Sequence, residues 1–193
     1  MTTPTRDAVL TKFDLATGLS SEKDPLRRKL SAMKGMFADE NAYQAQLAKE
    51  DTLIYEFYDM GVPYEEVETA YGTSITYAGK VGDEFNMTKG HFHTKLNTSE
   101  IYFCLSGQGL MLMENPEGHV QVAEFTPGQA VYVPGRYAHR SINTHPSEPL
   151  ITFFAFPGDA GHDYGTIETK GFRKIVVAEG EGYKLVDNPK WKA

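Results

Sequence analysis

The chain contains one cysteine, no long apolar run and no dense cluster of basic residues. A single cysteine, Cys104 among 193 residues, excludes an intrachain disulfide and fits a reducing compartment. No stretch approaches the roughly 18 apolar residues that a membrane helix needs, and the first residues lack the apolar core of a signal peptide. A formal net charge of −7 without any basic stripe argues against a nucleic-acid partner. We therefore expect a cytoplasmic protein that contacts neither nucleic acid nor a membrane.

The composition and patterning of the sequence change near residue 52. Residues 1–50 carry Ser and Asp helix-start signals and spaced apolar positions, which predict two short helices over residues 20–39 and 39–51. From residue 52 onward, short runs of β-branched and aromatic residues are separated by Gly, Pro, Asn and Asp. The predicted strands lie within residues 53–60, 65–79, 100–125, 130–135, 150–156 and 172–191.

Strands without intervening helices predict an antiparallel arrangement. No long helical pattern interrupts residues 52–157, and neither a repeat nor a linker divides the chain. We predict a mainly β protein with one domain over residues 1–193, an antiparallel β-barrel or jelly-roll sandwich. Residues 1–50 would form a helical extension, and residues 52–193 the barrel with a C-terminal hairpin.

Two stretches of the sequence hold metal-ligating residue types. In "GHFHTKLNTSEIY", residues 90–102, His91 and His93 would point to the same side of an extended strand, and Glu100 follows. The second stretch, "GQAVYVPGRYAHRSIN", delivers His139 after a Pro-Gly turn. Imidazole nitrogens with one carboxylate suit Zn, Mn, Fe or Ni rather than Mg or Ca. An HxH pair alone is a weak signal, and the four residues together are a stronger one.

These two stretches resemble the paired motifs of the cupin superfamily, in which a small β-barrel holds a metal on three His and one Glu. His91, His93, Glu100 and His139 match those four positions. Two features depart from the usual pattern. Six residues, 94–99, separate His93 from Glu100 where three or four are usual, and Arg136 stands where a glycine is usual.

Several strings resemble one cupin branch, the metal-dependent, archaeal-type glucose-6-phosphate isomerases. They are the six-residue interval, "KGHFH", "DAGHDYGT" and "VDNPKW", and the likeness runs from about residue 8 to the end of the chain. The resemblance implies interconversion of glucose 6-phosphate and fructose 6-phosphate, a step of glycolysis and gluconeogenesis. It also implies a homodimer with one divalent ion per subunit, Fe²⁺ foremost, with Mn²⁺, Zn²⁺ or Ni²⁺ as alternatives.

The resemblance also implies roles for individual residues. Glu100, His162 and Tyr102 would be catalytic, with Glu100 as the base of a proton transfer through a cis-enediolate. A metal-assisted hydride shift that needs no base stays open as the competing mechanism. No GxxxxGK[ST] loop is present to bind a phosphate, so hydroxyls and backbone N–H groups would do so. The substrate-binding residues implied are Tyr55, Ser74, Thr88, Gly90 and Tyr164.

Other interpretations of these residues and of the chain remain. Without the resemblance, Tyr55, Ser74 and Thr88 would be ordinary strand residues, and His162 could be a structural cap in a loop. An Fe²⁺-dependent cupin dioxygenase acting on a small organic substrate is the alternative enzyme. A sugar-sensing module without catalysis is a third possibility, weakened by the lack of a DNA-binding segment.

Overall fold

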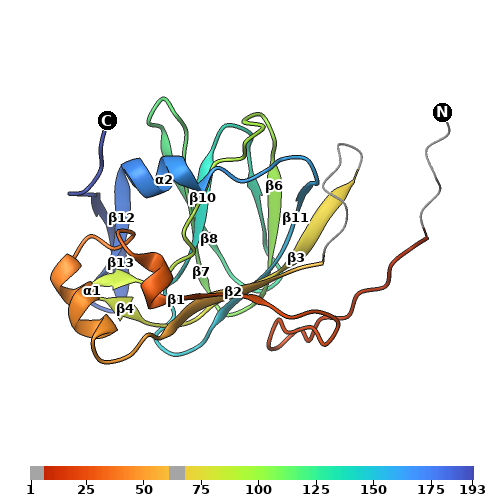
Figure 1. The fold of residues 1–193 in the computed structure, drawn as a ribbon, viewed down its shortest axis with the longest axis horizontal. Helices are drawn as coiled ribbons and strands as arrows, with labels where there is room; N and C mark the ends of the chain where they lie inside the picture. The colour runs from red at the N-terminus through yellow and green to blue at the C-terminus, as the bar shows by residue number, and fades with distance from the viewer. Residues whose placement is uncertain (1–6, 61–67) are drawn as a thin grey trace.

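The computed structural model describes residues 7–60 and 68–193, and its elements are mostly short strands (Figure 1). Residues 65–67, with which one predicted strand begins, lie outside the described part. The helical elements are η1 (Leu30–Met33), α1 (Glu40–Leu47) and α2 (Tyr164–Lys170). The strands are β1 (Leu26–Lys29), β2 (Leu53–Asp59), β3 (Thr69–Thr76), β4 (Lys80–Val81), β5 (Glu84–Phe85), β6 (Glu100–Ser106), β7 (Gly109–Glu114), β8 (Val120–Phe125), β9 (Ala130–Val133), β10 (Ala138–Asn143), β11 (Leu150–Pro157), β12 (Lys174–Glu179) and β13 (Gly182–Asp187).

The described strands form three antiparallel sheets. The largest has the order β1-β2-β3-β11-β6-β9, the second is β10-β7-β8, and the smallest is β13-β12-β5-β4. The mainly β, cupin-type barrel expected from the sequence is therefore confirmed. The predicted C-terminal hairpin is confirmed as well, since β12 pairs with β13, and β7 forms another hairpin with β8.

The β10-β7-β8 sheet separates two apolar layers. On β7, Met111 and Met113 belong to the cluster inside the barrel, together with Tyr102 and Phe154. Leu110 and Leu112 alternate with these methionines and belong to another cluster, which extends to η1, α1 and β12. Because successive strand side chains point to opposite faces, β7 and β10 each serve both layers.

The N-terminal extension differs from its prediction. The second predicted helix is confirmed as α1, whose N-cap Asp39 accepts a hydrogen bond from the backbone N–H of Ala42 at 2.9 Å. The first predicted helix is wrong, because its residues form β1 and the short 3₁₀-helix η1. β1 pairs with β2, with Arg28 opposite Tyr55, so backbone bonds to a distant strand override the local helical signals.

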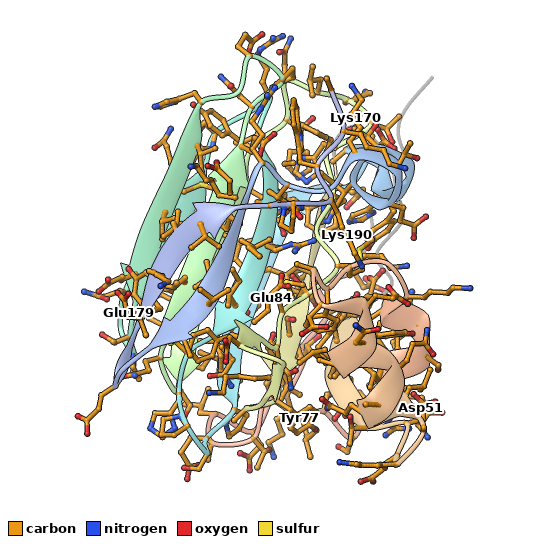
Figure 2. All side chains as sticks on the ribbon, turned by 90° about the vertical axis from the view of Figure 1, so that its left-hand side faces the viewer. Asp51, Tyr77, Glu84, Lys170, Glu179 and Lys190 are labelled. Atoms are coloured by element: carbon orange, nitrogen blue, oxygen red, sulfur yellow. The ribbon has the colours of Figure 1, made fainter. Side chains whose placement is uncertain are left out.

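Residues 37–40, which lead into α1, pack against the C-terminal tail beside the smallest sheet. Glu84 and Lys190 lie between the β12–β13 hairpin and α1 (Figure 2). The Lys190 ammonium donates to the backbone carbonyl of Phe37 at 2.8 Å, and a carboxylate oxygen of Glu84 accepts from the N–H of Ala38 at 2.8 Å. None of the helices in the described residues combines the length and apolar character needed to cross a bilayer.

Candidate metal centre and substrate pocket

Four buried side chains from separate elements converge inside the barrel. His91 and His93 lie in the segment between β5 and β6, Glu100 begins β6, and His139 lies on β10. Their ligating atoms all lie within 4.8 Å of one another. The backbones of His91 and His139 form an isolated antiparallel bridge, with N–H···O distances of 3.3 and 3.1 Å. Tertiary pairing thus gathers the predicted ligands, although they are up to 48 positions apart in the sequence.

The hydrogen bonds of the imidazoles fit a bound cation. Nδ1 of His93 lies 3.0 Å from the carbonyl oxygen of Thr98, and Nδ1 of His139 lies 3.2 Å from that of Tyr137, so each Nδ1 is the protonated donor. In neutral rings both Nε2 atoms are then acceptors, yet they lie 3.1 and 2.9 Å from the same carboxylate oxygen of Glu100. A cation bound between these acceptor atoms would remove the repulsion between the Nε2 lone pairs and the carboxylate oxygen.

His91 completes the donor set. Its Nε2 is buried and has no hydrogen-bond partner among the described residues. Burial, reinforced by His139, holds the pKa of His91 well below its ordinary value, so this ring is neutral at pH 7. Burial disfavours the Glu100 carboxylate, but His139 and His93 outweigh burial and hold the pKa of Glu100 well below its usual range. Three imidazoles and one ionised carboxylate could therefore hold a divalent ion.

A pocket opens over this cluster and encloses about 590 Å³, including its mouth. The ring centroid of His162 lies 4.5 Å from that of His91, and the His162 and Tyr164 rings stack at 5.8 Å. His93 lies on the opposite side of the cluster and borders a neighbouring groove. The other sequence-predicted site residues all line the pocket: Tyr55, Ser74, Thr88, Gly90, His91, Glu100, Tyr102, His139, His162 and Tyr164.

Burial sets the protonation states of the groups around the cluster. It lowers the pKa of His162, which is therefore a neutral proton acceptor at pH 7. Burial, reinforced by the charge of Glu100, raises the pKa of Tyr102 well above its ordinary value. Burial together with Tyr55 raises the pKa of Tyr164 to about 12. Both tyrosines thus keep their hydroxyl protons at neutral pH.

The pocket also has lining residues that sequence reasoning missed. Ser141 lies two positions after His139 on β10, and the period of two along a strand could have identified it. Lys89 stands between two predicted phosphate-binding residues and is the one Lys or Arg among the lining residues in the described part of the chain. Phe154 reaches the pocket because β11 pairs with β6, a pairing that no local signal indicates.

Comparison with known proteins decides the family. The family model described as Glucose-6-phosphate isomerase (GPI) matches residues 27–192. The chain belongs to the glucose-6-phosphate isomerase family. The Thermococcus onnurineus glucose-6-phosphate isomerase is 47% identical over 182 residues, which are 94% of this chain and 95% of that relative. The Pyrococcus furiosus glucose-6-phosphate isomerase is 46% identical over 181 residues, 94% and 95% of the two chains.

A bacterial member of the glucose-6-phosphate isomerase family also matches. The Sinorhizobium medicae glucose-6-phosphate isomerase is 37% identical over 185 residues, 94% of this chain and 86% of that relative. Among solved structures, a recombinant oxalate oxidase in complex with glycolate matches 61% of this chain and 58% of its own, with 11% identity and a TM-score of 0.49. The named relatives do not favour the dioxygenase alternative.

Proposed function

We propose that this protein is a metal-dependent aldose–ketose isomerase that interconverts glucose 6-phosphate and fructose 6-phosphate. The convergence of His91, His93, Glu100 and His139 at the floor of a polar pocket supports this proposal most directly. The family to which the chain belongs supplies the substrate class.

The donor set suits a single divalent ion, and we propose Fe²⁺, with Mn²⁺, Zn²⁺ or Ni²⁺ able to replace it. When bound, the ion would act as a Lewis acid toward the oxygens on C1 and C2 of the open-chain sugar. Nδ1 of His93 and of His139 donate to backbone carbonyls, which fixes both rings with Nε2 aimed at the site.

Isomerisation also requires a hydrogen to move between C1 and C2. Glu100 is buried and ionised, and we propose it as the base that carries this proton by way of a cis-enediolate. A hydride shift without a base is the competing route. We propose that neutral His162, whose ring centroid lies 4.5 Å from that of His91, opens the sugar ring by proton transfer. Tyr102 would donate a hydrogen bond to a sugar oxygen.

We propose that the phosphate of the substrate binds against Thr88 and Gly90. The Thr88 hydroxyl accepts a hydrogen bond from the backbone N–H of Ser141 at 3.1 Å, which fixes this hydroxyl against β10. Tyr55, Ser74 and Tyr164 line the same pocket and supply hydroxyl donors. Lys89 also lines the pocket, and its ammonium is paired with the Glu168 carboxylate at 2.5 Å.

An apolar surface supports a homodimer. On the outer face of the largest sheet, Ile101, Phe103 and Tyr132 are 48%, 38% and 61% exposed, and Ile101 lies directly opposite Tyr132 across β6 and β9. Exposed apolar side chains beside an edge strand favour association. Tyr132→Lys would shift the sedimenting species toward a monomer, whereas Leu185→Lys on β13 would not. A wild-type monomer at micromolar concentration would contradict the dimer.

We also propose that the protein is cytoplasmic and forms one domain with one metal site per subunit. It would act in glycolysis and gluconeogenesis. A coupled assay that reports glucose 6-phosphate formed from fructose 6-phosphate tests it. EDTA should abolish activity, and Fe²⁺, Mn²⁺ or Ni²⁺ should restore it. Activity that survives both chelation and Glu100→Ala would overturn the proposal, and oxygen uptake without sugar-phosphate turnover would favour a dioxygenase.

A further inference from the structure

An arginine is buried beside the pocket, on the face of β10 that points away from it. Arg140 lies between His139 and Ser141, both of which line the pocket, and its own side chain is directed into the layer between β10 and the smallest sheet. Only 3% of its surface is exposed. Arginine is almost never buried so completely without a specific partner, so its contacts need an explanation.

The Arg140 side chain binds the segment that carries the predicted phosphate site. One guanidinium nitrogen, Nη2, donates to the backbone carbonyl of Lys89 at 2.6 Å. The other, Nη1, lies 2.8 Å from the sulfur of Met87. The guanidinium also lies over the ring of Phe172, 4.4 Å from its centroid. A charged donor on a buried carbonyl makes a stronger bond than a neutral one.

The backbone pairing between this segment and β10 is interrupted where Arg140 acts. The N–H of Thr88 donates to the carbonyl of Ser141 at 2.9 Å, and His91 pairs with His139. Between these two points, Lys89 and Gly90 stand opposite the single residue Arg140, which is the residue count of a β-bulge. The Arg140 side chain therefore supplies the tie that the backbone ladder lacks at this position.

The clamped carbonyl determines the direction of the next N–H group. In a trans peptide unit the C=O and N–H point in opposite directions, and the described chain has no cis peptide bonds. Because the Lys89 carbonyl points to Arg140, the N–H of Gly90 points toward the pocket that Gly90 lines. No protein acceptor for this N–H is found within residues 7–60 and 68–193.

Gly90 fits this bulge for two reasons. Its φ of +78° lies in the left-handed region that favours glycine. A Cβ at this position would also lie 2.7 Å from the ring of Phe172, the same ring on which Arg140 is stacked. The Arg140 guanidinium and the Phe172 ring therefore hold the Lys89–Gly90 peptide unit, and glycine suits its conformation.

We propose that Arg140 is a positioning residue, which turns the Lys89–Gly90 peptide so that the N–H of Gly90 binds the phosphate group of the substrate. The inference rests on the proposed function for the identity of the ligand. The guanidinium does not touch the substrate. It fixes the donor direction and polarises the peptide, since a charged partner on a C=O strengthens the N–H of the same unit.

Arg140→Met tests the inference, because methionine keeps the apolar length of the side chain and removes its charge and donors. We expect the KM for fructose 6-phosphate and the inhibition constant of inorganic phosphate to rise together by about 10- to 100-fold. The kcat should stay within about threefold of wild type, because the metal ligands are unchanged. Arg140→Lys, which keeps one charged donor, should recover part of the loss.

Arg173→Met is the matched control. Arg173 is also stacked on an aromatic ring, that of Trp191 at 4.2 Å, but it borders the neighbouring groove instead of the pocket. Its KM and phosphate inhibition should match wild type. Metal content measured on each purified variant separates a phosphate effect from damage to the adjacent His139.

An NMR measurement tests the Gly90 donor directly, first in the wild-type protein and then in Arg140→Met. In the Zn²⁺-loaded protein, inorganic phosphate should move the amide proton of Gly90 downfield in a ¹H–¹⁵N spectrum, and this shift should be lost in Arg140→Met. A Gly90 amide that does not respond to saturating phosphate overturns the inference. So does an Arg140→Met enzyme whose phosphate inhibition is unchanged, or whose kcat falls together with its metal content. Absence of isomerase activity in wild type would instead refute the proposed function.

Discussion

The two faces of β10 show how differently one strand can use buried polar groups. On the pocket face, His139 and Ser141 have partners that aim them at a shared site, and Nε2 of His139 lies 2.9 Å from the Glu100 carboxylate. On the other face, Arg140 lies near the carboxylates of Glu84 and Glu114 without a direct bond to either. Under the proposed function, the first face contributes to the ligand site, whereas the second holds the backbone that surrounds that site.

On the face of β10 that points away from the pocket, buried charged groups have atoms that lack hydrogen-bond partners in the described part of the chain, which lowers stability. The polar groups of the metal cluster would instead gain a partner on binding an ion. One carboxylate oxygen of Glu84 and the Nε of Arg140 have no hydrogen-bond partner among the described residues. Burial raises the pKa of Glu84 to about 7, so its charged form is disfavoured in the folded protein. An uncompensated buried charge lowers stability.

The largest expected effect concerns the pocket face. His93→Ala removes one ligand and leaves the Glu100 carboxylate without one of its two short imidazole contacts. We expect isomerase activity to fall by about a thousandfold and the bound metal to be lost on dialysis. Metal analysis and the coupled assay measure both.

His119→Ala provides the control for this variant, since His119 is exposed on the turn between β7 and β8 and bonds to the hydroxyl of Tyr137 at 2.7 Å. It should keep full activity and metal content. If His93→Ala also keeps both, the pocket face is not a metal site and the comparison of the two faces fails.

A smaller effect is expected for Glu84, which lies near Arg140. It concerns the stability of the fold, and it depends on pH. Because the folded-state pKa of Glu84, about 7, exceeds its unfolded value of 4.5, the folded state binds more protons between these values. Stability should therefore fall as the pH rises from about 5 to 8. Glu84→Gln keeps an acceptor for the N–H of Ala38 and removes this loss, so at pH 8 it should be about 2 kcal/mol more stable than wild type.

Urea unfolding of wild type and Glu84→Gln at pH 5 and pH 8 gives the required difference, with the two proteins of nearly equal stability at pH 5. Glu40→Gln is the control, because Glu40 is exposed and hydrogen bonds from Gln44 and Lys190 lower its pKa. It should show no gain at pH 8. A Glu84→Gln variant that is less stable than wild type at pH 8 would mean that the Glu84 charge is needed next to Arg140.

The smallest effect concerns the turn that leads into both faces of β10. Arg136 has a φ of +74°, the one positive value among non-glycine residues in the described ranges, and it stands where cupins usually have glycine. Arg136→Gly should relieve this strain and stabilise the protein by about 0.5–1 kcal/mol, less the exposed ion pair with Glu117. Thermal unfolding at fixed metal concentration measures the gain, and a lower melting temperature would contradict it.

Spacing along the chain predicted the candidate metal ligands, whereas the resemblance to the isomerase family implied the other predicted pocket residues. Two histidines at a period of two and a third after a Pro-Gly turn are local signals, and the structure brings them together as expected. The residues of β1 carried helical signals of the same quality, and the prediction of a helix there was wrong. A local sequence pattern holds no information about the edge of β2. This edge forms backbone hydrogen bonds with the segment that the tertiary structure brings alongside it.

The sequence by itself determined a β-rich, acidic chain with one metal-ligating set and the strings of its family. Only the tertiary structure decided which face of β10 each residue serves, and hence that Arg140 lies behind Lys89 and Gly90. The physical reason is that a side chain's environment depends on the sheets packed on each side of its strand. These sheets come from segments that are distant in the sequence, and no short window of residues contains both.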